Sequence, residues 1–233
     1  MTTFINPTLY LLAMGVGLGT FVDQNRHGPS LGVSYLQFVA PGLAAVAAAT
    51  TAAGESMYPV MGAIKWNRTY LAMLSTPLRV ADVLAGHLAW MAVRVATAVT
   101  AYLLVMVAFS ATTSWQAIGV IPAGILTGMA FAAPLAAYAA TQQSEGGFSL
   151  VLRLAIVPLF LFSGVFFPIT QLPVGLRIVA YITPLWHGVD LCRHLTLGQA
   201  GTTSTILHVL YLAGVSAAGA GAALVTYRRR LRT

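Results

Sequence analysis

Residues 205–227, TILHVLYLAGVSAAGAGAALVTY, carry no charged side chain and are followed directly by Arg228, Arg229, Arg230 and then Arg232. An uninterrupted apolar run of about 20 residues is long enough to cross the hydrocarbon core of a bilayer as a helix. Arginines at the end of such a run are typical of a helix end held in anionic headgroups. This stretch therefore predicts a membrane-spanning helix that ends on the cytoplasmic side.

The rest of the chain repeats the same pattern. Of the 233 residues, 58% are hydrophobic and only 7% are charged, whereas about 25% of the residues of a soluble domain are charged. This composition excludes a soluble globular enzyme and a disordered chain. Five more apolar runs are long enough to span: 4–22, 35–53, 88–109, 117–140 and 148–167. We predict an all-α polytopic membrane protein with six transmembrane helices in a single domain, 1–233.

The basic residues sit at the ends of the apolar runs, so the net charge of +7 does not indicate a nucleic-acid partner. With six spans, both termini lie on one side, together with Lys65, Arg68 and Arg79. The opposite side holds Arg26, Arg177 and Arg193. Because cytoplasmic loops carry the excess of Lys and Arg, we predict that both termini are cytoplasmic.

The predicted cytoplasmic segment, 55–82, contains a short helix over 68–77 with an apolar side formed by Leu71, Met73 and Leu74. Pro77 ends this helix, and Tyr70 and Leu74 share one face. Spacing alone leaves two interpretations open. The helix either docks in a groove of a partner protein or lies in the membrane interface.

The predicted external segment, 168–202, holds two apolar stretches, 172–181 and 185–195, which are too short to span and are separated at Pro184. We expect two short helices that dip into the outer leaflet. His187, Asp190 and His194 fall on one helical face, and two histidines with a carboxylate can bind zinc. No fourth ligand is evident, so we assign no metal and expect hydrogen bonds and an Asp190–Arg193 surface pair.

The fifth span carries Phe160, Phe162, Phe166 and Phe167 around Ser163. These side chains either line a path for a hydrophobic substrate or pack against lipid and neighbouring helices. By helical spacing, Phe162 and Phe166 share a face.

Two further features of the spans each allow two interpretations. Arg94 lies inside the third span, where it either extends to the headgroups or places a charge in a transport path. Gly15 and Gly19 form a small-residue pair in the first span, which serves either ordinary helix packing or a subunit contact.

Several catalytic motifs are missing from the sequence. The only lysine, Lys65, is followed by Trp66, so a Gly-Lys-Ser/Thr phosphate loop is impossible. No two carboxylates are close in sequence. The chain is therefore not expected to be an enzyme or to hold a cofactor. If it transports a substrate, a separate subunit supplies the energy; a membrane scaffold that binds partners without transport is the alternative.

Four motifs occur in order along the chain: YLQFVAPGL at 35–43, RTYLAMLSTPL at 68–78, LFSGVFFP at 161–168 with QLP at 171–173, and PLWHGVDL at 184–191. Together they resemble the type 2 family of ABC transporter permeases. The branch to which they are most similar comprises the nodulation lipo-oligosaccharide and daunorubicin-resistance exporters. Family members usually have an amphipathic cytoplasmic helix before the first span, whereas the first apolar run here begins almost at Met1.

The resemblance implies an exporter in a bacterial plasma membrane. Two permease copies, or two related subunits, pair with two ABC ATPase subunits, which hold ATP and Mg²⁺. The substrate would be amphipathic: a lipid-linked saccharide, a glycolipid or a hydrophobic drug. A third hypothesis is an intramembrane metalloenzyme that uses His187, Asp190 and His194.

The resemblance also assigns roles to residues. It implies that the loop at 68–78 is the coupling helix that docks on the ATPase, with the contact residues Arg68, Tyr70, Leu71, Leu74, Ser75, Thr76 and Pro77. On this assignment, Leu74→Asp uncouples transport from ATP hydrolysis. The span at 148–167 would form part of the substrate path and of the subunit contact, with the path residues Phe160, Phe162, Ser163, Phe166 and Phe167. External re-entrant helices would cap the path, with Pro184, His187, Asp190 and Arg193.

Overall fold

The computed structural model describes residues 2–24, 33–199 and 201–231. Arg26 and Arg232, which entered the prediction of orientation, lie outside the described residues. The described part of the chain contains helices and connecting turns and no β-strand, which confirms the all-α prediction.

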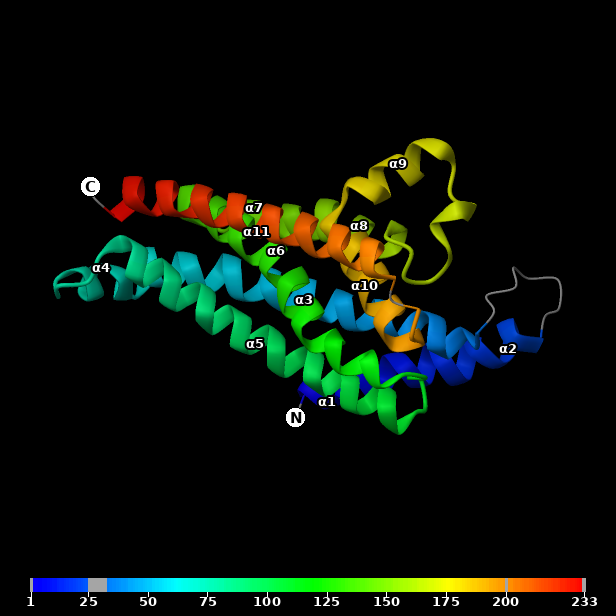
Figure 1. Ribbon diagram of the computed structural model, residues 1–233. Helices are drawn as coiled ribbons and strands as arrows, with labels where there is room; N and C mark the ends of the chain where they lie inside the picture. The colour runs from blue at the N-terminus through cyan, green and yellow to red at the C-terminus, as the bar shows by residue number, and fades with distance from the viewer. Residues whose placement is uncertain (1, 25–32, 200, 232–233) are drawn as a thin grey trace.

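The first half of the chain forms a continuous amino-terminal helix and two long helices (Figure 1). In order, the elements are α1 (Thr2–Leu11), η1 (Leu12–Leu18), α2 (Gly19–Gln24), α3 (Tyr35–Met61), η2 (Gly62–Trp66), α4 (Thr69–Leu74) and α5 (Val80–Ala108). The second half adds η3 (Trp115–Gly119), α6 (Val120–Thr141), α7 (Gly146–Val151), η4 (Leu152–Ile156), α8 (Val157–Phe162), η5 (Ile169–Gln171), α9 (Val174–Ile182), α10 (Pro184–Leu197) and α11 (Thr202–Leu231).

Local sequence signals explain where several helices begin and end. Ser34 caps α3: its hydroxyl accepts from the Gln37 backbone while the Gln37 side chain accepts from the Ser34 backbone, the reciprocal pair of a capping box. Thr183 caps α10, with Pro184 in the first turn, where proline is tolerated. Gly198, at φ +68°, ends α10 in the left-handed conformation that glycine adopts readily.

Helix α6 is the centre of the bundle and packs most extensively on α11 and α3. Small residues allow this close approach. A Cβ added at Gly124 would lie 2.7 Å from the Val99 side chain on α5, and one added at Gly219 on α11 would lie 2.5 Å from Pro134 on α6. Close backbone contact through small residues is the usual way in which lipid-embedded helices associate.

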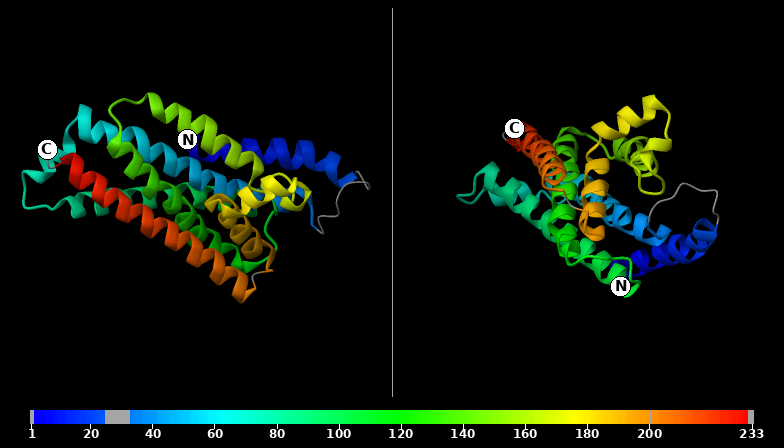
Figure 2. Two further views of the ribbon diagram at one scale, coloured as in Figure 1. Left: turned by 90° about the horizontal axis from the view of Figure 1, so that it is seen from above. Right: turned by 45° about the vertical axis from the view of Figure 1, so that its right-hand side comes forward.

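Four helical stretches in the described residues are long and apolar enough to cross a membrane: Tyr35–Trp66, Val80–Ala108, Trp115–Thr141 and Thr202–Leu231. Two shorter apolar helices, Pro7–Val22 and Gly146–Phe162, fall where the first and fifth spans were predicted. The amino-terminal helix begins about midway along the bundle, whereas α11 ends beside α4 at one end of it (Figures 1 and 2).

The structure corrects two predicted boundaries. The second apolar helix does not stop at Glu55 but continues to Trp66, since glutamate is a good helix former; within the helix, the Glu55 carboxylate pairs with Arg94. The fifth does not reach residue 167. It ends at Phe162, and the chain leaves the helix at Gly164, whose φ is +77°.

Gly15 has a packing role within the chain. A Cβ at this position would lie 2.3 Å from the Leu36 side chain at the start of α3. The predicted small-residue pair of the first span therefore contributes, through Gly15, to contact between the amino-terminal helix and α3.

Candidate functional site

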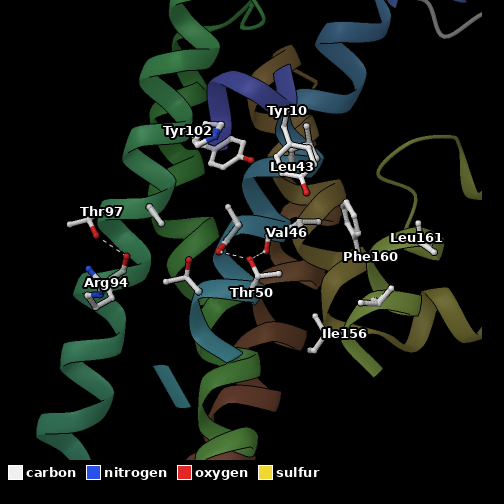
Figure 3. Close-up of a pocket in the computed structure, with 15 residues that line it drawn as sticks. Tyr10, Leu43, Val46, Thr50, Arg94, Thr97, Tyr102, Ile156, Phe160 and Leu161 are labelled. Atoms are coloured by element: carbon white, nitrogen blue, oxygen red, sulfur yellow. Dashed lines mark hydrogen bonds between the residues drawn. The ribbon is translucent and has the colours of Figure 1, made fainter. Parts of the chain in front are cut away.

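A cavity of about 520 Å³ opens between α1, α3, α5 and the segment from η4 to α8. Figure 3 shows Tyr10, Leu43, Thr50, Arg94, Tyr102 and Phe160 arranged around it. Small-molecule sites usually measure about 300–1,000 Å³ and combine apolar walls with a few polar groups. The cavity has this size, and its lining is mainly apolar with hydroxyl groups contributed by α1, α3 and α5.

Two of the threonines that line the cavity donate their hydroxyl protons to backbone carbonyls of their own helices. The Thr50 hydroxyl donates to the Val46 carbonyl at 2.9 Å, and the Thr97 hydroxyl donates to the Arg94 carbonyl at 2.8 Å (Figure 3). A hydroxyl that donates in this way keeps its oxygen lone pairs as acceptors. The α3 and α5 walls therefore offer hydrogen-bond acceptors to a ligand rich in hydroxyl groups.

Arg94 also lines the cavity and forms an ion pair. Its Nε lies 2.9 Å from Oε1 of Glu55, so α5 is joined to α3. Arg94 therefore stands at the cavity wall with a partner on α3, and its extension to the headgroups and its place in a transport path both stay predictions. The sequence did not indicate the partner, because Glu55 lies 39 positions away.

The predicted path phenylalanines separate in the structure. Among them, Phe160 lines the cavity, and its ring packs edge-on against Phe166 at 5.0 Å between centroids. Phe162 is 38% exposed, and Phe167 packs against a separate apolar cluster of Ile169, Leu172 and Ala180. The prediction that Phe162 and Phe166 share a helical face is wrong, because α8 ends at Phe162.

Ser163 is buried, and its hydroxyl donates to the Leu159 carbonyl. It therefore completes the end of α8 and is not among the residues that line the cavity.

Helix α4, within the predicted coupling segment, is anchored through Tyr70. The Tyr70 side chain is buried, and its ring lies 5.7 Å from the Tyr227 ring on α11 and 6.0 Å from the His87 ring on α5. Burial raises the pKa of the Tyr70 phenol to about 12, so the anchor is uncharged at neutral pH. Tyr70 therefore joins α4 to two long helices, α5 and α11, through two ring contacts.

The other side of α4 is open. Leu71 and Met73 are exposed, whereas Leu74 is partly buried against the core of the bundle. The hydroxyls of Ser75 and Thr76 donate to the Ala72 and Met73 carbonyls. The helix ends at Leu74, so the prediction that it continues to Pro77 is wrong. Arg68 precedes α4 in the left-handed conformation, at φ 50°.

Basic residues gather at the same end of the bundle as α4. Lys65 donates to the Gln143 backbone carbonyl at 2.6 Å, and Arg230 donates to the Gln143 side-chain oxygen at 3.0 Å. Arg79 and Arg228 line a small pocket beside Leu74. The sequence prediction that these residues share one side is consistent with this arrangement.

At the opposite end, α10 is fixed by Arg193. The guanidinium donates to the carbonyls of Phe38, at 3.2 Å, and Gly164, at 2.8 Å. It also lies 3.9 Å from the centre of the Phe38 ring, within the range of a cation–π contact. The expected Asp190–Arg193 surface pair is wrong: the guanidinium is directed at these carbonyls, and the ion pairs of Asp190 among the described residues are with histidines.

Asp190 pairs instead with histidines. Its Oδ2 lies 3.1 Å from Nε2 of His208 and 3.8 Å from Nδ1 of His194. His187 contacts His208 through the two Nδ1 atoms, at 2.8 Å. Sequence spacing missed His208, because it lies on α11. Pro184 occupies the first turn of α10.

A family model described as "ABC-2 type transporter" matches residues 1–197. The chain belongs to the ABC-2 type transporter family. This finding confirms the resemblance predicted from the four motifs, and together with the apolar helices it identifies an integral membrane transport subunit.

Individual known proteins are also similar over most of their length. Nodulation protein J of Rhizobium leguminosarum bv. trifolii is 37% identical over 193 residues, which cover 83% of this chain and 72% of that protein. Nodulation protein J of Rhizobium meliloti (strain 1021) is 33% identical over 204 residues, 88% of this chain and 74% of the relative. The inner membrane transport permease YadH of Escherichia coli (strain K12) is 27% identical over 197 residues, 83% and 73% of the two chains.

Proposed function

We propose that this chain is the permease subunit of an ABC exporter in a bacterial plasma membrane. It would move an amphipathic substrate outward with energy from ATP hydrolysed, with Mg²⁺, on a separate ATPase subunit. The observation that carries the proposal is α4, whose Tyr70 is buried against α5 and α11 while Leu71 and Met73 remain exposed.

An anchored helix with exposed apolar side chains is suited to a groove on a partner protein. Leu71 is 43% exposed and Met73 is 40% exposed. In the proposed complex these side chains insert into the ATPase, and Arg68, Ser75, Thr76 and Pro77 lie at the margins of the contact. Tyr70 and Leu74 face the bundle and carry the motion to the spans.

The proposed topology has six crossings, formed by the four long helices and the two shorter apolar ones. The end that holds α4, Lys65 and Arg230 would face the cytoplasm, because basic residues are retained there. Both termini would then be cytoplasmic. Helices α9 and α10 would lie at the outer leaflet as re-entrant helices.

A second permease subunit would complete the transport path. Four apolar residues at helical spacing are exposed along α7, η4 and α8: Leu150, Leu154, Val157 and Leu161. A stripe at this spacing presents one continuous helix face. We assign it to the contact with the second permease, identical or related, and two ATPase subunits would complete the complex.

The cavity supports an amphipathic substrate. Leu43, Ile156 and Phe160 provide apolar surface, whereas Thr50 and Thr97 provide oxygen acceptors. A molecule with an acyl chain and sugar hydroxyls satisfies both kinds of wall. A lipid-linked saccharide or glycolipid therefore suits the lining better than a purely hydrophobic drug.

The docking proposal is tested with Leu71→Asp in the purified permease–ATPase complex. Because Leu71 is exposed, the charge should leave the thermal melting of the permease unchanged while reducing co-purification of the ATPase and glycolipid-stimulated ATP hydrolysis. Leu74→Asp is a less direct probe, because Leu74 also packs on the core.

Leu71→Met is the matched control, since it keeps an apolar side chain of similar volume and should retain ATPase binding. Normal ATPase retention and normal stimulated hydrolysis in Leu71→Asp would show that α4 is not the docking element. Uptake of a fluorescent glycolipid into inverted vesicles, measured for the same variants, separates loss of docking from loss of transport.

A further inference from the structure

The carboxylate and two of the imidazoles at the junction of α10 and α11 converge on one point. Asp190 and His194 lie one turn apart on α10, and His208 approaches from the first turns of α11. One ligand atom from each, Asp190 Oδ2, His194 Nδ1 and His208 Nε2, lies within 4.8 Å of the others. The two helices are in direct contact there (Figure 1).

The hydrogen-bond chain behind this cluster sets the direction of the His208 lone pair. The Tyr181 carbonyl lies 3.0 Å from Nε2 of His187 and can only accept, so this nitrogen carries a proton. Nδ1 of a neutral His187 is then an acceptor, and it receives the proton of His208 Nδ1 at 2.8 Å. Nε2 of a neutral His208 therefore directs a lone pair at Asp190.

Two electron-rich atoms thus face each other, the carboxylate oxygen of Asp190 and Nε2 of His208, only 3.1 Å apart. This contact is favourable only with a cation at it, either a proton or a metal ion. The Nδ1 of His194 lies 3.8 Å from the same carboxylate oxygen, too far for a hydrogen bond. That buried nitrogen has no hydrogen-bond partner among the described residues.

We propose that Asp190, His194 and His208 bind a divalent transition-metal ion of the zinc class, which fastens α10 to α11. Two imidazole nitrogens and one carboxylate oxygen form a ligand set typical of zinc. With bonds of about 2.0–2.1 Å, tetrahedral zinc holds its ligand atoms roughly 3.3 Å apart. Two of the three separations, 3.1 and 3.8 Å, lie on either side of this value, and all three ligand atoms lie within 4.8 Å of one another.

His187 is a positioning residue in this site. A metal-binding histidine commonly donates its other ring N–H to a neighbouring acceptor, which orients the ring. His187 is that acceptor, and its own ring stacks on Tyr211 at 3.9 Å between centroids. Arg193, although adjacent in sequence, directs its donors at the Phe38 and Gly164 carbonyls, so the carboxylate remains available to a cation.

The site is distinct from the cavity and from α4, so its test does not depend on transport. The full chain, purified in detergent with its affinity tag removed, is stripped with a chelator and titrated with Zn²⁺ and with Co²⁺. We expect one equivalent of either ion per chain and a visible Co²⁺ absorption band typical of a four-coordinate site. Bound Zn²⁺ should also raise the melting temperature.

Variants identify the ligands. His208→Gln and Asp190→Asn should abolish the Co²⁺ band, and His187→Phe should weaken Zn²⁺ binding by about 10–100-fold. His194→Gln changes a partly exposed residue, so it keeps the test valid if the other variants melt early without metal. His87 is a histidine on α5 outside the cluster. His87→Gln is therefore the matched control and should bind Zn²⁺ normally.

Three results would overturn the proposal. The wild-type chain could take up less than one equivalent of Zn²⁺. His208→Gln and His194→Gln could bind Zn²⁺ as the wild type does, or His87→Gln could lose as much Zn²⁺ binding as the ligand variants. In the first case, the cation between Asp190 and His208 is a proton.

Discussion

Arg94 on α5 lies 2.9 Å from Glu55 on α3, and Arg94 also lines the cavity between α1, α3, α5 and α8. It explains two features at once: an acidic residue inside an apolar helix and an arginine inside another. Each charge reduces the cost of placing the other in an apolar region, which a lone charge would have to bear in full. The pair also joins α3 and α5, two of the helices that line the cavity.

We expect Arg94→Met to reduce substrate-stimulated ATPase activity, because it removes the guanidinium from the cavity and leaves Glu55 without its partner. The Arg94 side chain is 49% exposed, so the loss of stability should be small, about 1 kcal/mol or less. Thermal melting and stimulated ATPase activity of the complex measure the two effects. The double variant Arg94→Met/Glu55→Met should melt above the single one; equal melting of the two would contradict a coupled pair.

Replacing Arg193 should destabilise the packing of α10 on α3. Arg193→Met removes two charged donors to the Phe38 and Gly164 carbonyls and the contact with the Phe38 ring. Loss of hydrogen bonds from a charged group predicts a cost of about 2–3 kcal/mol, measured as a lower melting temperature in detergent. Arg193→Lys keeps the charge but not the planar fork and should lie between wild type and Arg193→Met. A melting temperature of Arg193→Met equal to that of wild type would refute this role.

Gly219 should tolerate no side chain, whereas Gly221 should. A Cβ at Gly219 would lie 2.5 Å from Pro134 on α6, but one at Gly221 meets no atom within 4 Å. Forcing extra volume into a packed contact predicts a loss of about 1–3 kcal/mol for Gly219→Val. Melting of both valine variants checks this prediction, since helix propensity changes equally in the two. Equal destabilisation would show that α6 and α11 are not in contact at this point.

The anchoring of α4 should depend on the Tyr70 ring. Tyr70→Phe keeps the aromatic contacts with Tyr227 and His87, so melting and ATPase stimulation should stay near wild type. Tyr70→Ala empties a buried position, which predicts a loss of about 3 kcal/mol and weaker stimulation of the ATPase. If Tyr70→Ala stimulates normally, α4 does not transmit motion through this contact.

The pattern of apolar runs in the sequence was sufficient to predict the long helices but not to predict where each of them ends. The charge-free run at 205–227, followed by arginines, predicted α11 closely, since the helix extends from Thr202 to Leu231. Glu55 was taken as the border of the second span, since a charge normally ends a span, and only the tertiary structure shows that its charge has a partner, Arg94, on another helix. Likewise, spacing along α10 grouped His187 with Asp190 and His194, whereas the atom that approaches Asp190 belongs to His208.

Composition, apolar run length and the four motifs determined that this protein is an all-helical membrane subunit of the ABC-2 family, because these properties are local to each segment. Only the tertiary structure decided four other features: the cavity, the pairing of Arg94 with Glu55, the packing of Tyr70 between α5 and α11, and the cluster at Asp190. Each depends on side chains from different helices, and which faces of those helices meet is set by the packing of small residues between them.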